Sequence, residues 1–311
     1  MLLVCEELRR GIPPGESAIT LGVFDGVHRG HGALVERLCV EAQARQLTPG
    51  VITFHPSPIS VLRPAVSLTY LESLERRVEL LEEMGAEFVT VVSFTSELAQ
   101  VSEREFLRLL VQEARARLLV VGADFALGRG REGTVERLTE LGAPLGLEVV
   151  SLELVAAGEV KVSSTRIRGA LAQGEMEEVT RLLGRSYSLR GPVLGGEERG
   201  RQLGFPTLNI GVSPDRALPP NGVYITRADA NGQHFGAVTN IGVRPTFDES
   251  ERYVETHLLD FDGDLYGAHV SIELLHRLRA EQRFSGPEAL VAQIRTDVAA
   301  SRDYLSQVAL V

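Results

Sequence analysis

Residues 22–31 read Gly-Val-Phe-Asp-Gly-Val-His-Arg-Gly-His, and they connect the first apolar run, Ile19–Phe24, to a helical pattern at Gly32–Arg45. Glycines at such a turn let the backbone approach a ligand closely. The start of the helix offers free N–H groups and the positive end of its dipole. Two histidines three residues apart, His28 and His31, can both donate to one phosphate there. The stretch therefore predicts a phosphate-binding strand-to-helix turn.

Strand-like and helix-like segments alternate through the first half of the chain. Further apolar runs and helical patterns follow in turn, at Val51–Phe54, Leu74–Met84, Phe88–Phe94, Glu103–Arg115, Leu118–Val121, Gly133–Leu141 and Leu147–Leu152. Ser102 and Glu105 have the spacing of a capping box. Strands that alternate with helices indicate a parallel, doubly wound α/β sheet.

The pattern changes near Gly184. From Tyr187 to Leu275 short strand-like segments are broken by turn signals such as Asn231-Gly232, which predicts an antiparallel sheet or barrel. A last helix is expected after Ser285, with Pro287 in its first turn. The sequence thus predicts two domains, residues 1–185 and 186–311.

Composition excludes several classes of protein. The 311 residues carry 32 basic and 42 acidic side chains, a net charge of −10, and no tryptophan, which argues against a nucleic-acid platform. Lys161 is the only lysine, so a P-loop is excluded. No apolar run approaches the roughly 20 residues of a membrane span, and Met1–Arg10 does not fit a signal peptide. Cys5 and Cys39 are too few for a disulfide framework or a cysteine-based zinc site. We expect a cytoplasmic protein.

Two other interpretations of the histidine pair remain open. A zinc site competes, but the pair lacks a third ligand at a sensible spacing. A glycine-rich loop with surface histidines would be the default for either histidine alone. Two histidines framed by Phe-Asp-Gly favour the phosphate interpretation.

The pattern Gly-x-Phe-Asp-Gly-x-His-x-Gly-His resembles the signature of the nucleotidylyltransferase superfamily, in the form carried by bacterial FAD synthetases. A second segment at 162–168, Val-Ser-Ser-Thr-Arg-Ile-Arg, resembles that family's Ser-Ser-Thr-x-Ile-Arg motif. The resemblance implies that His28 and His31 are catalytic, neutralising phosphate charge as pyrophosphate leaves. It also implies a set of nucleotide- and phosphate-binding residues: Gly22, Phe24, Gly26, Gly30, Ser164, Thr165 and Arg168.

Two more segments of the first half match less closely. Residues 121–128 resemble the family's Val-Gly-x-Asp/Asn-Phe-x-Phe-Gly loop, which implies that Asp124 and Phe125 bind flavin, although Leu127 replaces a phenylalanine. Residues 54–58 resemble Phe-x-Pro-His-Pro, with Ser57 in place of the histidine. No role is assigned to His55.

In the second half, residues 204–209 resemble the riboflavin kinase motif Gly-Phe-Pro-Thr-Ala-Asn, with Leu208 for alanine, and Gln202 stands where many members have lysine. Thr207 and Asn209 are two apart, so on a strand they face the same way, and their neutral oxygens suit a hard cation. Gly204 is expected beside phosphate. For an isolated Pro-Thr-x-Asn, the alternative is that these residues only form a turn at the start of a strand.

The resemblance continues downstream. Residues 240–247 resemble the family's flavin-side loop, which implies that Asn240 and Arg244 contact flavin. By the same correspondence Glu255 is the general base for the riboflavin 5′-hydroxyl. The spacing of Asp260, Asp262 and Asp264 suggests a calcium loop, but the EF-hand continuation is missing and a turn is favoured.

The resemblance covers almost the whole chain and implies membership of the bacterial bifunctional riboflavin kinase/FMN adenylyltransferase family. It implies a Rossmann-like α/β domain and an antiparallel β-barrel closed by a C-terminal helix. The implied substrates are riboflavin, FMN and ATP, with Mg²⁺ and without nucleic acid or membrane partners; oligomerisation is left open. Two alternatives remain, a nucleotidylyltransferase with another phosphate acceptor and a flavin-binding regulator without catalysis.

Overall fold

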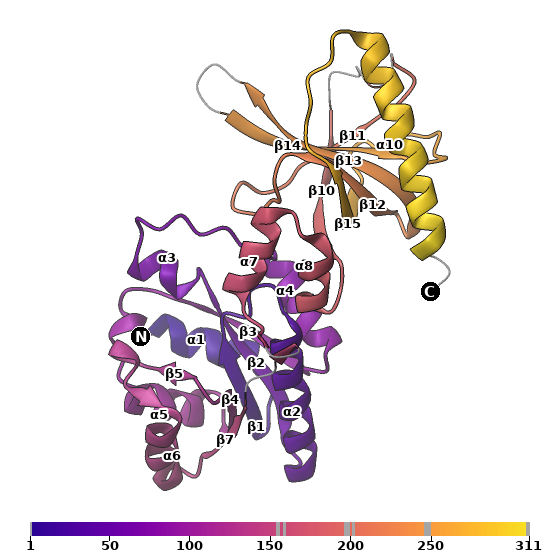
Figure 1. Ribbon diagram of the computed structural model, residues 1–311. Coiled ribbons are helices and arrows are strands. Elements are labelled where there is room, and N and C mark those ends of the chain that lie inside the picture. Colours follow the sequence, from indigo (N-terminus) through magenta and orange to yellow (C-terminus); the bar gives the residue numbers. More distant parts are fainter. Residues whose placement is uncertain are drawn as a thin grey trace. The chain divides into compact units, whose positions relative to one another are not determined.

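The computed structural model describes residues 2–153, 156–157, 160–195, 200, 203–245 and 250–308. The chain forms two compact units, Met1–Ser164 and Thr165–Val311 (Figure 1). Gln202 and the 246–249 part of the predicted flavin-side loop lie outside the described residues.

The first unit is built on a parallel sheet in the order β3-β2-β1-β4-β7, which confirms the predicted α/β class. Its strands are β1 (Ser17–Gly22), β2 (Thr48–His55), β3 (Phe88–Ser93), β4 (Ala116–Gly122) and β7 (Glu148–Leu152). The order reverses at β1, which has β2 on one side and β4 on the other. In open parallel sheets, ligands bind outside the carboxyl ends of the strands at such a switch point. The Gly22–His31 stretch therefore begins where a ligand site is expected.

Helices cover both faces of this sheet, and each face has its own core. The helices of the unit are α1 (Leu2–Gly11), α2 (Arg29–Arg45), α3 (Pro58–Leu62), α4 (Leu74–Glu83), α5 (Glu103–Glu113) and α6 (Val135–Gly142). Apolar residues of α1, α5 and α6 pack with Ile19 and Leu21 of β1, and those of α2 and α4 pack with Ala18. The alternation along β1 follows from the period of two in a strand. Figure 1 shows α2 on the opposite side of the sheet from α5 and α6.

Short elements complete the first unit. They are the 3₁₀ turns η1 (Leu98–Gln100), η2 (Arg129–Arg131) and η3 (Ala143–Leu145), and the two-residue strands β5 (Ala126–Leu127), β6 (Gly133–Thr134), β8 (Ala156–Ala157) and β9 (Val160–Lys161). Ser102 caps α5 by accepting the Glu105 N–H at 3.3 Å, which confirms that part of the capping prediction.

Helix α1 was not predicted. Val4 and Leu8 are buried, so one face of the helix joins the core. The Glu7 carboxylate accepts hydrogen bonds from the N–H and the hydroxyl of Ser93, at 2.9 and 2.6 Å, and ties the helix to the end of β3.

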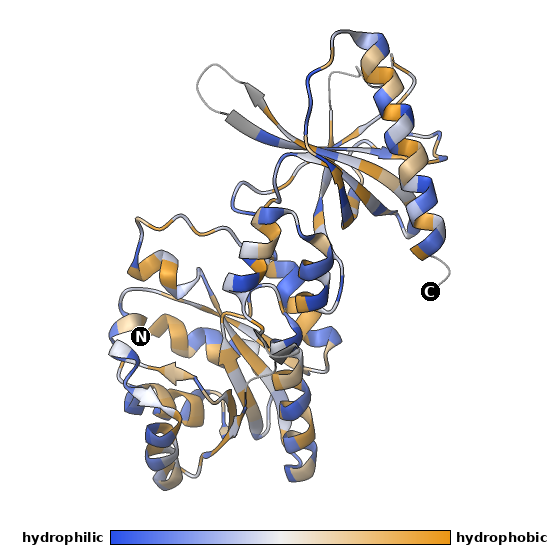
Figure 2. Ribbon diagram, in the orientation of Figure 1, coloured by the Kyte–Doolittle hydropathy of each residue, from blue (hydrophilic) through white to orange (hydrophobic). Residues whose placement is uncertain are grey.

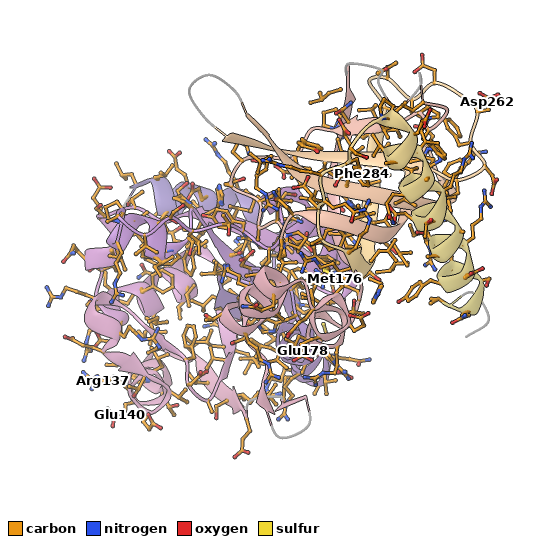
Figure 3. The ribbon with its side chains drawn as sticks, turned by 45° about the horizontal axis from the view of Figure 1, so that its top comes forward. Arg137, Glu140, Met176, Glu178, Asp262 and Phe284 are labelled. Carbon is orange, nitrogen blue, oxygen red and sulfur yellow. The ribbon has the colours of Figure 1, made fainter. Side chains whose placement is uncertain are left out.

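Two helices precede the barrel strands, α7 (Ser164–Gln173) and α8 (Met176–Leu183). Arg166 of α7 donates to Glu178 of α8 at 2.8 Å (Glu178 is labelled in Figure 3), and α8 packs on strands β10 and β15 of the barrel. For this reason the compact units divide at Ser164/Thr165. The assignment of the two activities to residues 1–185 and 186–311 stays a prediction.

The second unit is a closed antiparallel barrel in the order β10-β11-β14-β13-β12-β15, as the sequence predicts. Its elements are β10 (Tyr187–Leu194), β11 (Leu208–Ile210), β12 (Gly222–Ala230), β13 (Gln233–Pro245), β14 (Ser250–Leu258), β15 (His269–Arg279) and the final helix α10 (Pro287–Val308). Figure 2 shows apolar and polar residues interleaved along α10, and Figure 1 shows this helix lying against the barrel. Pro287 begins α10, as expected for its first turn.

Three buried threonines join neighbouring strands inside the barrel. The hydroxyls of Thr226 and Thr239 lie 2.8 Å apart, and those of Thr239 and Thr256 lie 3.0 Å apart. Because each hydroxyl can donate and accept, the three can satisfy one another. Among the described residues, no helix combines the length and the apolar character needed to cross a bilayer.

Replacing Gly50 by alanine is expected to destabilise the first unit. Gly50 in β2 is paired with Phe88 in β3, and an added Cβ would lie 1.9 Å from the Phe88 ring. Relief of such a clash in a close-packed core costs about 1–3 kcal/mol, which thermal unfolding would detect as a lower midpoint. Gly32→Ala is the control, because its added Cβ would lie 3.7 Å from Met84, an ordinary contact. An unchanged midpoint for Gly50→Ala would show that the Phe88 ring moves aside without cost.

Candidate active sites

His28 and His31 cap helix α2 with each other. The Nδ1 atom of His28 accepts the N–H of His31, and the Nδ1 atom of His31 accepts the N–H of His28, both at 3.3 Å. The two rings are stacked, with centroids 3.6 Å apart and planes 14° from parallel. A neutral imidazole that accepts at Nδ1 carries its hydrogen at Nε2. Each histidine can therefore offer a ligand an Nε2–H donor while its Nδ1 holds the helix start.

The residues around the pair shape the turn. Phe24, Gly26 and Val27 have positive φ angles of 52°, 82° and 36°. The Phe24 and His31 rings are in edge contact, with their centroids 5.0 Å apart. A Cβ on Gly30 would come within 3.2 Å of the His28 ring, so glycine leaves room for that ring. The predicted phosphate contacts of these residues and of Gly22 stay predictions.

The turn is tied to two other segments of the first unit. Thr53, in β2, donates to the Val23 carbonyl at 3.1 Å. Ser164 donates to the Asp25 carbonyl at 2.8 Å, which brings the first residue of the Ser-Thr pair against the histidine turn. Thr165 and Arg168 lie on α7, Thr165 exposed and Arg168 partly so, and their contact with phosphate stays a prediction.

A cavity of about 770 Å³ opens beside the end of β1. Its walls are largely apolar, and they include Phe54, Phe94, Leu98, Phe125 and Leu127. This volume is in the range of small-molecule sites, and aromatic walls suit a flat ring system. Leu127 lines the cavity although it replaces an aromatic residue.

Polar residues lie at the same cavity. Asp124, which is exposed, and Phe125, which is partly buried, both line it, and their contact with flavin stays a prediction. Arg129 and Arg131 also line it, and both were missed from the sequence. Their signal was weak, since two arginines near a glycine are common on surfaces.

The Phe54–Pro58 segment is held through its backbone. Ser57 is buried, and its N–H donates to the Tyr70 hydroxyl at 2.9 Å. The His55 ring lies 5.7 Å from the Tyr70 ring. The Ser57 side chain makes no capping hydrogen bond to α3, so the structure gives the hydroxyl no capping role at this position.

In the barrel, Glu255 lies between two asparagines. On β14 it is paired with Asn209 of β11 on one side and with Asn240 of β13 on the other. Residues directly opposite one another in antiparallel strands project from the same face. The three side chains therefore form a polar row across three strands, and the Asn240 amide donates to the Tyr253 hydroxyl at 2.9 Å.

Two residues of the polar row, Glu255 and Asn240, line a cavity of about 380 Å³ together with Thr207 and Tyr253, and Asn209 is not in its lining. Thr207 also lines a neighbouring cavity of about 250 Å³ formed with residues 261–266. Thr207 precedes β11 and Asn209 lies within it, so only the second residue of the predicted pair is on the strand. Thr207 thus stands where two cavities meet.

Helix α10 forms one wall of the larger of these two cavities. Arg279 at the end of β15 donates to both oxygens of Asp297 on α10, at 2.7–3.1 Å. The Arg279 guanidinium also lies 6.0 Å from the centre of the Phe284 ring, which is labelled in Figure 3. Asp297 is 4% exposed and lies on the same face as Ile294. An acidic residue on the apolar face of the predicted helix was the signal that could have identified it.

For the remaining predicted residues, the structure shows the backbone position but few side-chain contacts. Gly204 is exposed and has a φ of 84°, which favours glycine. Arg244 lies on β13, and its side chain is outside the described residues.

The Asp260–Asp264 segment forms a turn. Asp260 pairs with Arg302, which lowers the pKa of the Asp260 carboxyl, and Asp264 accepts the Tyr266 N–H at 2.9 Å. Within the part of the chain that is described, no cluster of three potential metal ligands of the His, Cys, Asp and Glu types occurs.

The chain matches two family models. The model described as FAD synthetase matches residues 13–166, and the model described as riboflavin kinase matches residues 183–305. The first match contains the histidine turn and the 770 Å³ cavity, and the second contains the Glu255 row.

Curated relatives are similar over nearly the whole chain. The bifunctional riboflavin kinase/FMN adenylyltransferases of Bacillus subtilis and Escherichia coli are each 36% identical over 94% of this chain, and the matches cover 93% and 94% of those proteins. That of Pseudomonas fluorescens is 39% identical over 91% of each chain. Among solved structures, one from Streptococcus pneumoniae, titled as a macrolide-efflux protein, has a TM-score of 0.87 and 30% identity, and the match covers 94% of this chain and 96% of that one.

Proposed function

This chain belongs to the bifunctional riboflavin kinase/FMN adenylyltransferase family, and from that premise we propose which residues carry out each of its two reactions. The enzyme phosphorylates riboflavin with ATP to give FMN, and it transfers AMP from ATP to FMN to give FAD and pyrophosphate. We assign adenylylation to residues 1–185 and phosphorylation to residues 186–311. The observation that carries this division is that the two family models match separate segments, each with its own cavity.

In the kinase reaction we propose that Glu255 takes the proton from the riboflavin 5′-hydroxyl. The deprotonated oxygen attacks the γ-phosphorus of ATP, and the bond to the β-phosphate oxygen breaks to release ADP. Riboflavin occupies the 380 Å³ cavity, with Asn240 and Arg244 on the flavin side, and ATP occupies the 250 Å³ cavity. Thr207 lines both cavities, which supports transfer of the phosphoryl group from ATP in one cavity to riboflavin in the other, close to this residue. Gly204 is proposed to lie beside the phosphates.

Thr207 and Asn209 are proposed to hold the Mg²⁺ ion of this reaction. Their hydroxyl and amide oxygens are hard neutral donors, which suit a cation that also binds phosphate oxygens. Asn209 is paired with Glu255, so a carboxylate adds negative charge beside the two neutral donors. The residues present therefore fit the ion. When bound, Mg²⁺ neutralises charge on the β- and γ-phosphates.

In the adenylylation reaction, an oxygen of the FMN phosphate attacks the α-phosphorus of ATP and pyrophosphate leaves. This phosphate is already ionised, so the reaction needs no strong base from the protein. We propose that the Nε2–H groups of His28 and His31 donate to phosphate oxygens and stabilise charge that develops there. Ser164, Thr165 and Arg168 bind the triphosphate, and the apolar 770 Å³ cavity holds the flavin beside Asp124 and Phe125.

The substrates in this proposal are small molecules, and the balance of 42 acidic against 32 basic residues gives no support to a nucleic-acid partner. Free ATP as the donor in both steps is consistent with a cytoplasmic location, which we also propose.

One incubation tests the proposed reaction order and the need for Mg²⁺. Purified protein is mixed with riboflavin, ATP and Mg²⁺, and the flavins are separated by chromatography over time. FMN is expected first and FAD after it, and chelation of Mg²⁺ by EDTA is expected to stop FMN formation. FMN that accumulates without FAD would locate a defect in the first half of the chain. Flavin binding without any product, even when FMN is supplied, would favour a flavin-binding regulator.

A further inference from the structure

A buried ion pair lies behind the histidine turn. The Asp25 side chain is 4% exposed and the Arg77 side chain is 0% exposed, and Arg77 Nη2 lies 3.8 Å from Asp25 Oδ1. We propose that Arg77, acting through Asp25, is a positioning residue for His28 and His31 in FMN adenylylation. This inference rests on the proposed role of the two histidines.

Asp25 connects the turn to a segment far along the chain. Its carboxylate accepts the N–H of Leu71 at 2.9 and 3.1 Å and the N–H of Glu72 at 3.2 Å. Its carbonyl accepts the Ser164 hydroxyl. Asp25 therefore fixes the middle of the turn from both its side chain and its backbone.

Arg77 joins this carboxylate to the end of β2. Its Nη1 donates to the Phe54 carbonyl at 3.4 Å, and its guanidinium lies 5.6 Å from the centre of the Tyr70 ring. The Tyr70 hydroxyl in turn accepts the Ser57 N–H. One buried cation thus contacts the histidine turn, the 70–72 segment and the strand end beside the cavity.

The turn needs this support because its backbone is strained. Phe24 and Val27 have φ angles of 52° and 36°, in the left-handed region that side chains with a Cβ disfavour. Such conformations persist only where the surroundings fix them, and they gather at functional sites. Val27 precedes His28 directly. A relaxed turn would therefore move the N-cap and the direction of both Nε2–H groups.

A buried carboxylate without its cation is poorly stabilised, so removal of Arg77 acts on Asp25 first. Arg77→Met keeps the length and apolar bulk of the side chain and removes its charge and hydrogen bonds. A displacement of catalytic groups by about 1 Å can lower a rate about 100-fold. With FMN supplied directly, we expect Arg77→Met to lower kcat for FAD formation about 100-fold, with KM for FMN nearly unchanged.

Two further variants separate positioning from general stability. Arg77→Lys restores the charge and should recover at least about tenfold of the lost kcat. Asp25→Asn keeps an oxygen for the two backbone N–H groups and removes the charge that faces Arg77, so it should lower kcat like Arg77→Met. It also keeps the proposal testable if Arg77→Met does not fold. Arg76→Met is the matched control, because the neighbouring Arg76 pairs with Glu79 and Glu83 instead.

Riboflavin kinase activity of the same samples is the internal measure of folded protein, and it should not change. Wild-type kcat for FAD formation in Arg77→Met and Asp25→Asn would overturn the inference, as would an equal loss of both activities or a loss without rescue by lysine. If a variant that removes the His28 Nε2–H keeps full FAD formation, the proposed histidine role itself fails. If that variant is inactive while the Arg77 and Asp25 variants are fully active, only the positioning role fails.

Discussion

Replacing His28 by asparagine together with His31 by glutamine should lower FAD formation by at least about 100- to 1,000-fold, with the helix cap preserved. Asparagine is a favoured N-cap residue, and glutamine at the third helical position completes a capping box. The double variant therefore keeps the acceptors that the two Nδ1 atoms provide and replaces both imidazole Nε2–H donors by amide N–H groups in other positions. The expected loss is in transition-state stabilisation, which kcat for adenylylation of supplied FMN measures.

The controls for this variant follow from the same geometry. His28→Ala with His31→Ala removes the cap and the donors together, so it should lose FAD formation and also lower the thermal midpoint. FMN formation should be largely intact in both double variants. If His28→Asn with His31→Gln makes FAD at the wild-type rate, the imidazole Nε2–H donors are not needed and the proposed histidine role fails.

Glu255→Gln should have the opposite pattern and stop phosphorylation while supplied FMN is still adenylylated. Glutamine keeps the size of the side chain and its place between Asn209 and Asn240. It cannot accept the proton of the riboflavin hydroxyl, and loss of a general base lowers a rate by about 10²- to 10⁴-fold. Chromatography of FMN from riboflavin and of FAD from FMN, on the same preparation, checks both halves of the expectation.

Glu273→Gln is the matched control for this variant. Glu273 is also a barrel glutamate and lies on β15, where its side chain is 42% exposed. Its Oε2 atom lies 3.8 Å from Nη1 of Arg227 on β12. It should leave both activities unchanged. Normal FMN production by Glu255→Gln would remove Glu255 as the base.

Alternating apolar and helical segments predicted the parallel sheet of the first half, and turn signals predicted an antiparallel sheet or barrel in the second; the choice of a barrel came from the family resemblance. The five long strands of the first unit and the four predicted helices appear in order, with ends shifted by a few residues. Helix α1 was missed because its burial depends on contact with β3, a partner far along the chain. Helices α7 and α8 joined the barrel unit for the same reason, since packing and not sequence position decides where a helix belongs.

In the candidate sites too, local motifs could be predicted from the sequence, whereas contacts between distant segments could not. The glycines and histidines of one turn are visible in the sequence, and so is the Thr207–Asn209 pair, of which only Asn209 lies on a strand; their roles stay predictions. Arg77 and Asp297 were not identified, because their partners, Asp25 and Arg279, come from other segments. Each is a charged residue on the buried face of a helix, which is the one local sign that a distant partner exists.

Closure of the barrel has a consequence for the order of folding during synthesis. Its first strand, β10, pairs with its last, β15. Tyr187 therefore cannot pair with its partner residue Leu274 until β15 has been synthesised. The parallel sheet of the first unit is complete at β7, which ends at Leu152. Since domains generally fold as they emerge, N-terminal first, the half proposed to make FAD can form its sheet while the other half still has an open edge. A chain interrupted before residue 269 would keep that edge, with β10 and β12 both lacking their common partner.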